Sequence, residues 1–221
     1  MVSLLDIIGP VMVGPSSSHT AGACRLGLIA RALAGGQPAK ALVELHGSFA
    51  RTGVGHGTDR AIAGGLLGFH PDDERLRSSL ALAEAAGMTV SFVNTRLREA
   101  LHPNTARITI WRDAHSASLT GSSIGAGRIL VTEIDGFPVE ITGAYPTLVI
   151  AAADLPGAVA AIAAVLSSSD VNVATLRLSR RRKGGDAIHV YELDSAPPPA
   201  TLDNLRALLP VHSLRLVERV S

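Results

Sequence analysis

The pattern of apolar and polar residues changes near residue 145. Beyond it, runs that alternate as strands do are separated by alanine- and leucine-rich runs with the period of helices. We expect strands at 147–153, 171–180, 187–193 and 211–220, and helices at 158–166 and 201–209. Thr201 is positioned to cap the second helix. The order of these elements predicts a ferredoxin-like βαββαβ unit over residues 146–221.

Residues 1–145 mix helical and strand-like runs. We expect helices at 3–8, 20–33, 58–67 and 72–86, and strands at 39–45, 88–93, 107–111, 116–121 and 128–134. The fold class is therefore α+β, with a mixed α/β domain over residues 1–145 and the smaller βαββαβ domain over residues 146–221.

The composition argues against several classes of partner. The formal net charge is +1 and aromatic residues make up 3% of the chain, which disfavours nucleic-acid binding. Apolar runs are too short to span a membrane, and no basic segment precedes a hydrophobic stretch at the N-terminus. We therefore expect a cytoplasmic protein with neither a nucleic-acid nor a membrane partner. The basic run at 180–183 is interpreted as a solvated turn.

Cys24 is the single cysteine of the chain. One thiol cannot form an intramolecular disulfide, and an iron–sulfur cluster needs several thiolates. The eight histidines show neither an HxxxH-type pair nor cysteine partners at the spacing of a zinc site. The sequence therefore predicts no metal site formed by this chain alone.

A cluster of hydroxyl groups and an imidazole lies at the start of the helix expected at 20–33. Its members are Ser16, Ser17, Ser18, His19 and Thr20. Hydroxyls and the free N–H groups of a helix start favour an anion such as a carboxylate or a phosphate. The histidine can move a proton near neutral pH. A serine-rich cap with a surface histidine is the alternative, but the combined motif favours a functional site.

A second polar helix start follows the glycine-rich segment 46–59, which we expect to be a loop. His56, Thr58 and Asp59 lie at the beginning of the next helix, with Thr58 as its cap. We expect the two polar helix starts to face one pocket. The segments 102–105 and 121–127 are also polar or glycine-rich, and the second matches neither a dinucleotide fingerprint nor a P-loop. For it, a structural turn and a ligand contact are equally open.

Residues 146–221 resemble an ACT domain. The resemblance rests on the turn Asp154-Leu155-Pro156-Gly157 after the first strand and on Val171-Asn172-Val173 at the start of the second. It implies self-association and a small-ligand site, usually for an amino acid, at Asp154, Pro156, Gly157 and Asn172. A glycine beside a helix N-terminus suits a bound carboxylate. A pairing surface without a ligand is an equally open alternative.

Over essentially the whole chain, the motifs GPSSSHT, HGSFARTGVGHGTD, HPNT and SSIGAG, followed by the ACT-like unit, resemble the β subunit of iron–sulfur-dependent L-serine dehydratase. The resemblance implies that residues 1–145 form the substrate-binding domain of an enzyme that converts L-serine to pyruvate and ammonia. It also implies a separate α subunit that holds a [4Fe-4S] cluster, whose iron acts as a Lewis acid on the serine hydroxyl.

The same resemblance assigns the site residues. The substrate-binding residues would be Ser16, Ser17, Ser18, Thr20 and Thr58. The catalytic residues would be His19, His56 and Asp59, and the sequence does not decide which histidine is the base. A non-catalytic subunit that senses an amino acid and regulates its partner is the alternative function.

Overall fold

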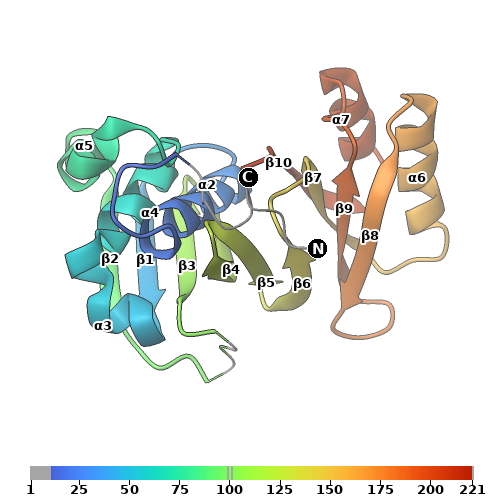
Figure 1. Ribbon diagram of the computed structural model, residues 1–221. Coiled ribbons are helices and arrows are strands. Elements are labelled where there is room, and N and C mark those ends of the chain that lie inside the picture. Colours follow the sequence, from blue (N-terminus) through green and yellow to red (C-terminus); the bar gives the residue numbers. More distant parts are fainter. Residues whose placement is uncertain (1–10, 99, 101, 221) are drawn as a thin grey trace, which may run out of the picture.

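The protein is described by a computed structural model that covers residues 11–98, 100 and 102–220. The helix expected at 3–8 lies outside these residues. Figure 1 shows two sheets with helices packed against them. The larger, six-stranded sheet has the order β2-β1-β3-β4-β5-β6. Its strands are β1 (Lys40–Leu45), β2 (Thr89–Asn94), β3 (Thr105–Arg112), β4 (His115–Gly125), β5 (Arg128–Ile134) and β6 (Phe137–Ile141). β1 and β2 are parallel, and the other neighbours are antiparallel.

Short helices accompany this sheet. They are the π-helical turn η1 (Ser18–Gly22), α2 (Ala23–Leu33), α3 (Gly47–His56), α4 (Thr58–Leu67), the 3₁₀ turn η2 (Glu74–Ser78) and α5 (Ser79–Ala85). Across the residues that the structure describes, no helix is long and apolar enough to cross a membrane.

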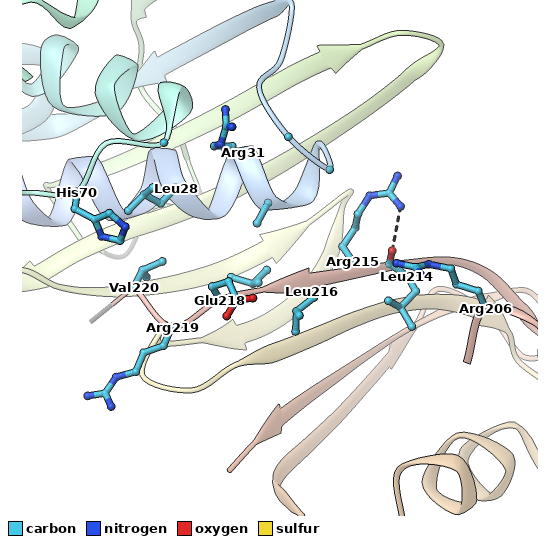
Figure 2. A pocket seen from close by; sticks show the side chains of 15 residues that line it. Leu28, Arg31, His70, Arg206, Leu214, Arg215, Leu216, Glu218, Arg219 and Val220 are labelled. Atoms are coloured by element: carbon cyan, nitrogen blue, oxygen red, sulfur yellow. Dashed lines mark hydrogen bonds between the residues drawn. The ribbon is translucent and has the colours of Figure 1, made fainter. Parts of the chain in front are cut away.

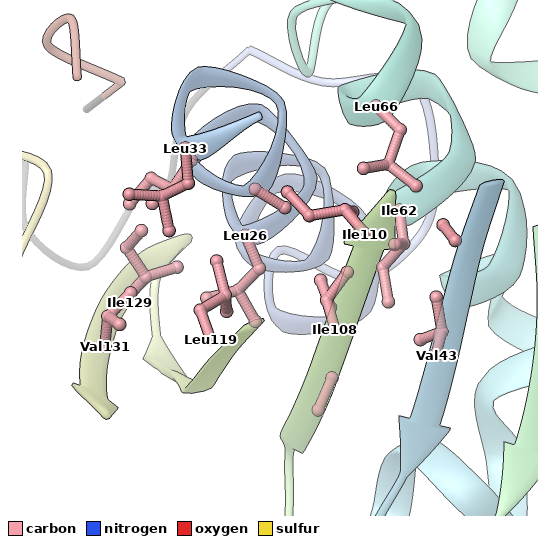
Figure 3. Close-up of a cluster of buried hydrophobic side chains, with 14 of the residues drawn as sticks. Leu26, Leu33, Val43, Ile62, Leu66, Ile108, Ile110, Leu119, Ile129 and Val131 are labelled. Atoms are coloured by element: carbon pink, nitrogen blue, oxygen red, sulfur yellow. The ribbon is translucent and has the colours of Figure 1, made fainter. Parts of the chain in front are cut away.

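The core of the larger sheet lies beneath α2 and α4 (Figure 3). Leu26 of α2 and Ile62 of α4 are fully buried in the same cluster as Ile108 and Ile110 of β3. Burying a leucine or isoleucine side chain stabilises a fold by about 1.5–3 kcal/mol. This apolar layer therefore fixes both helices on the sheet.

Glycines bring the backbones of α2 and α4 into direct contact. A Cβ atom at Gly65 would lie 2.1 Å from the carbonyl oxygen of Cys24, and one at Gly27 would lie 2.4 Å from that of Ile62. The two helices run with their N-terminal ends at the same end of the contact: Thr20 and Ala61 line one cavity, and Arg31 donates to the carbonyl of Leu66 at 3.1 Å. The segments that precede α2 and α4 consequently meet.

The second, four-stranded sheet has the order β10-β7-β9-β8, with all neighbours antiparallel. Its elements are β7 (Thr147–Ala153), α6 (Ala158–Ser168), β8 (Val173–Arg180), β9 (Asp186–Leu193), α7 (Pro199–Arg206) and β10 (Val211–Val217). This is the βαββαβ order that the sequence predicts. Leu148, Ile150 and Tyr191 form a core with the helices, whereas Val149 and Ile188 belong to the core of the larger sheet.

A cavity of about 510 Å³ lies between α2 and β10, where the two sheets meet (Figure 2). Leu28 and Leu216 line it from opposite sides, with Arg31 and Arg215 also in its wall. Arg215 joins β10 to α2 on this side, because its Nε donates to the carbonyl of Leu33 at 3.0 Å. Neither His19 nor His56 lines this cavity.

The segment expected to be a glycine-rich loop is largely helical. α3 spans Gly47–His56, and Gly57 ends it with the left-handed φ of 74° before α4 begins. Gly53 of α3 leaves room for Thr58, because a Cβ atom at residue 53 would lie only 3.2 Å from the Thr58 side chain. The expectation of a loop is therefore wrong for most of this segment, and Gly57 instead allows two helices to meet at a sharp corner.

Other boundaries differ for local reasons. Neither expected threonine cap is observed: Gly57 precedes α4, and Pro198 precedes α7, while the Thr201 hydroxyl donates to Ser169 at 2.8 Å. The helix expected at 72–86 starts as a 3₁₀ turn, because the Asp73 carboxylate accepts the N–H of Arg75 at 2.9 Å. β4 continues through much of the glycine-rich segment 121–127, and β6 was not expected at all.

Replacing Gly65 by alanine should lower the free energy of unfolding by about 1–3 kcal/mol, because neither helix backbone can move away from the new Cβ. Urea denaturation followed by circular dichroism measures the effect. Gly55→Ala is the matched control: nothing lies within 4 Å of a Cβ there, so its stability should stay constant or rise by up to about 1 kcal/mol. Equal stability of the two variants would contradict the close helix contact.

Candidate functional site

The serine-rich motif forms the first helical turn rather than a preceding loop. The N–H of Thr20 donates to the carbonyl of Ser16 at 2.8 Å, and the N–H of Gly22 donates to that of Ser17 at 2.9 Å. The hydroxyl of Ser16 accepts the N–H of His19 at 3.3 Å and so caps this turn. His19 is thereby fixed within the turn, with only 8% of its surface exposed.

Both ring nitrogens of His19 contact hydroxyl groups. Nδ1 lies 3.3 Å from Ser16 Oγ, and Nε2 lies 3.1 Å from Thr52 Oγ1 and 3.4 Å from Ser48 Oγ. Thr52 donates its own hydroxyl proton to the carbonyl of Ser48 at 3.0 Å. Its oxygen is therefore left to accept a proton from Nε2, which assigns the Nε2–H tautomer to neutral His19.

His56 lies beside His19 at the end of α3. The ring centroids are 4.9 Å apart. The Nδ1–H of the exposed His56 donates to the carbonyl of Thr52 at 2.9 Å, and Nε2 has no hydrogen-bond partner among the described residues. Burial, and then the charge of His56, lower the pKa of His19 below its ordinary value. The pair thus combines an enclosed, neutral imidazole with an accessible one.

Ser48 and Thr52 are the residues that sequence analysis missed. With His56 they repeat every fourth position along α3 and therefore share one helix face. Thr52 joins the histidines directly, because its hydroxyl contacts His19 and its carbonyl contacts His56. The spacing is visible in the sequence, but it carries meaning only once the segment is known to be helical.

A cavity of about 260 Å³ lies beside His56 at the starts of η1 and α4. Gly14, Thr20, His56 and Gly57 contribute to its wall. The Thr20 hydroxyl is buried and lacks a partner in the described structure. The cavity therefore combines a buried hydroxyl that has no described partner with an accessible imidazole.

The remaining expected residues lie around this center in different ways. Ser17 and Ser18 are half-buried, and the buried hydroxyl of Thr58 has no described partner. Asp59 accepts the N–H of Arg60 at 2.8 Å; among the described contacts, none joins its carboxylate to a histidine. The structure thus brings His19 and His56 together and leaves Asp59 as a helix-start residue.

The other two polar segments pack against the same region. The N–H of Ser48 donates to the carbonyl of Pro103 at 2.7 Å, and a Cβ at Gly22 would lie 2.1 Å from Ser123 Oγ. The hydroxyls of Thr105 and Ser122 are 2.7 Å apart. The segments 102–105 and 121–127 therefore support α3 and η1.

Comparison with known proteins shows the family of this chain. Residues 3–134 match the family model described as serine dehydratase beta chain. The chain belongs to the serine dehydratase beta-chain family. It is 44% identical over 208 residues to the "Probable L-serine dehydratase, beta chain" of Bacillus subtilis, covering 93% of both chains.

Two other L-serine dehydratase proteins are also similar to this chain. The "L-serine dehydratase, beta chain" of Peptoniphilus asaccharolyticus is 37% identical over 193 residues, covering 87% of both chains. "L-serine dehydratase 2" of Escherichia coli is 35% identical over 185 residues, which cover 70% of this chain but 39% of that longer protein.

The single thiol of this serine dehydratase beta chain is unsuited to bind metal. Cys24 is fully buried, and its S–H donates to the carbonyl of Phe69 at 3.1 Å. Burial raises the pKa of Cys24 to about 12, so the thiolate that a metal requires is disfavoured. In the described part of the chain, no group of at least three His, Cys, Asp or Glu side chains could hold a metal ion. An iron–sulfur cluster does not fit these residues.

The residues expected to bind a ligand in the ACT-like part are separated. Gly157 begins α6 with a left-handed φ of 87°, next to the exposed Pro156. Asp154 instead accepts bonds from Arg180 at 2.7 Å and Gly184 at 2.9 Å, and these bonds lower its pKa. Asn172 lies beyond the opposite end of α6 and donates to Asp194 at 2.7 Å. One copy of the chain does not gather these residues into a single pocket.

The pKa of His19 should rise toward its ordinary value in a His56→Ala variant, because the neighbouring positive charge is removed. Titration of the imidazole signals by NMR measures the change. His70→Ala removes an exposed histidine outside the contacts of His19 and should leave this pKa unaltered. An unchanged His19 pKa in His56→Ala would contradict the electrostatic coupling.

Proposed function

We propose that this chain is the β subunit of an L-serine dehydratase, which converts L-serine to pyruvate and ammonia together with a separate α subunit. Family membership and the 44% and 37% identical beta chains support this function. The observation that carries it is the pair His19 and His56, joined through Thr52 beside a cavity with a buried hydroxyl that has no described partner. Such a site can hold a small acid and move a proton, but it contains no electrophile for a leaving hydroxyl.

A second polypeptide accounts for the missing electrophile. The aligned region covers 39% of the longer E. coli enzyme, and the remainder of that protein has no aligned counterpart here. We propose that the α subunit holds a [4Fe-4S] cluster, since the buried Cys24 thiol cannot. The cluster would supply Lewis acidity toward the serine hydroxyl.

We assign the proton transfer to His56. Its Nδ1–H is held by Thr52, which leaves Nε2 as the acceptor for the Cα proton of serine. His19 positions Thr52 and thus His56, while the hydroxyls of Ser17, Ser18 and Thr20 and the start of α4 contact the substrate. Loss of the Cα proton and of the hydroxyl gives aminoacrylate, which tautomerises to an imine, and hydrolysis of this imine gives pyruvate and ammonia.

The C-terminal unit acts in this proposal as an ACT domain from residue 146 that pairs with a second copy. Its edge strand β8 has an unpaired side, and Leu176 and Leu178 are each 41% exposed on it. Antiparallel pairing of two β8 strands would set α6 beside its copy. The Gly157 turn of one copy would then approach Asn172 of the other, where an amino acid could bind. A cytoplasmic location suits the free thiol of Cys24.

The function is tested by anaerobic co-expression of this chain with a cysteine-containing α subunit. The purified pair should form pyruvate from L-serine, as followed with lactate dehydrogenase and NADH. A pair that holds the cluster, binds L-serine and forms no pyruvate would contradict the enzyme and favour the amino-acid-sensing subunit.

Within the active pair, His56→Ala should lower kcat by about 100- to 10,000-fold, the usual contribution of a general base. The Tm should stay close to that of the parent, because His56 is exposed. His115→Ala, at the exposed first residue of β4, is the matched control. A kcat within threefold of the parent would exclude His56 as the base.

Leu176→Arg should weaken self-association at least tenfold, because it introduces a charge into the apolar edge of β8; burying a leucine contributes about 1.5–3 kcal/mol. Analytical ultracentrifugation over a concentration series measures the dimer Kd. Leu209→Arg changes a fully exposed leucine elsewhere in the unit and should leave the Kd unchanged. Equal Kd values for all three proteins would place the interface on another surface.

A further inference from the structure

We infer that Arg60 and Arg77 bind the carboxylate of the amino-acid substrate in the cavity beside His56. This inference rests on the proposed function and extends it to a charge-specific binding site. Neither arginine belongs to the motifs that suggested the site from the sequence. Both line the cavity of about 260 Å³ together with Thr20 and His56.

The guanidinium of Arg60 lies over the corner between α3 and α4. Its Nη2 and Nε are 3.4 Å and 3.5 Å from the position that a Cβ on Gly57 would occupy. Because Gly57 directly follows His56, the positive charge lies next to the residue that carries the accessible imidazole. The absence of a side chain at Gly57 leaves the guanidinium open toward the cavity.

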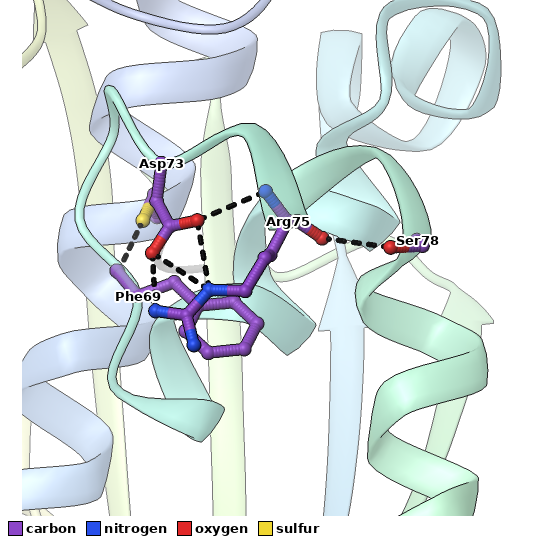
Figure 4. A network of polar contacts seen from close by, with 5 residues as sticks. Phe69, Asp73, Arg75 and Ser78 are labelled. Carbon is purple, nitrogen blue, oxygen red and sulfur yellow. Dashed lines mark hydrogen bonds and ion pairs between the residues drawn. The ribbon is translucent and has the colours of Figure 1, made fainter.

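The positive charges of Arg60 and Arg77 are uncompensated. Both residues are exposed, and within the described structure no carboxylate lies within ion-pair distance of either guanidinium. Arg75, on the same short 3₁₀ turn, differs in this respect: it pairs with Asp73 at 2.5 Å and stacks over Phe69 (Figure 4). Asp73 therefore neutralises the charge of Arg75, whereas Arg77 lines the cavity without a described acidic partner.

An independent feature points to a ligand in the same place. Thr20 is 3% exposed and contributes to the wall, yet its hydroxyl has no described partner. A buried hydroxyl normally has a hydrogen-bond partner. Two unpaired guanidinium groups and a buried hydroxyl without a described partner together match a carboxylate, since guanidinium groups bind carboxylates through paired N–H donors.

This assignment separates recognition from proton transfer. The carboxylate would lie against Arg60 and Arg77, and the Cα of the amino acid, one bond away, would come within reach of His56. A neutral analogue such as L-serinamide keeps the hydroxyl and the amine but lacks the anion. The arginines should therefore favour L-serine over L-serinamide.

Steady-state kinetics of the α–β pair with both compounds tests the inference. Arg60→Gln and Arg77→Gln should each raise the KM for L-serine by about 10- to 100-fold, the usual effect of losing a charge-assisted bond, with kcat within threefold of the parent. The preference for L-serine over L-serinamide should fall by the same factor, and Arg60→Lys should restore part of it. Arg182→Gln, at the exposed turn after β8, is the matched control.

Calorimetric titration of the same pairs separates this inference from the proposed function. If the parent pair binds L-serine more tightly than L-serinamide and the glutamine variants lose that preference, the inference stands even if no pyruvate forms. If pyruvate forms and the glutamine variants keep the KM and the preference of the parent, the arginine assignment fails while the enzyme assignment stands. Equal affinity of the parent for both compounds would also overturn the inference.

Discussion

The contact between the backbones of α2 and α4 is the constraint on which the site depends. Gly27 and Gly65 let the helices approach until a Cβ on either would collide with a carbonyl oxygen of the other. Since both helices start at the same end of this contact, η1 and the α3–α4 corner meet there. The 4.9 Å separation of the His19 and His56 rings follows from that packing. The relative positions of His19 and His56 thus depend on glycines more than two helical turns further along the chain.

The two histidines of the site differ in their exposure: His19 is buried and His56 is exposed. His19 has hydroxyl contacts at both nitrogens, and burial together with His56 favours its neutral form. His56 uses one nitrogen to bond with Thr52 and keeps the other available. In the proposed reaction, a base beside the cavity is useful only if the leaving hydroxyl is activated, and the buried Cys24 offers nothing for that purpose. In this account the partner subunit completes the site.

The sequence predicted much of the fold because most elements have regular apolar periodicity. The βαββαβ order of the second sheet is an example, as is the strand Lys40–Leu45. It failed at residues 47–56, where a glycine-rich loop was expected but α3 is observed; Gly53 leaves room there for the side chain of Thr58. That error hid Ser48 and Thr52. The placement of Arg60 and Arg77 in the wall of one cavity depends on three-dimensional neighbours, which single-residue preferences do not contain.

The most direct test of the divided site is titration of a cluster-loaded α subunit with this chain. Release of deuterium from the Cα of deuterated L-serine and formation of pyruvate are measured together. We expect neither with the α subunit alone, and we expect both to rise in proportion to added chain until one equivalent is reached. Deuterium release and pyruvate formation at the full rate by either polypeptide alone would contradict it.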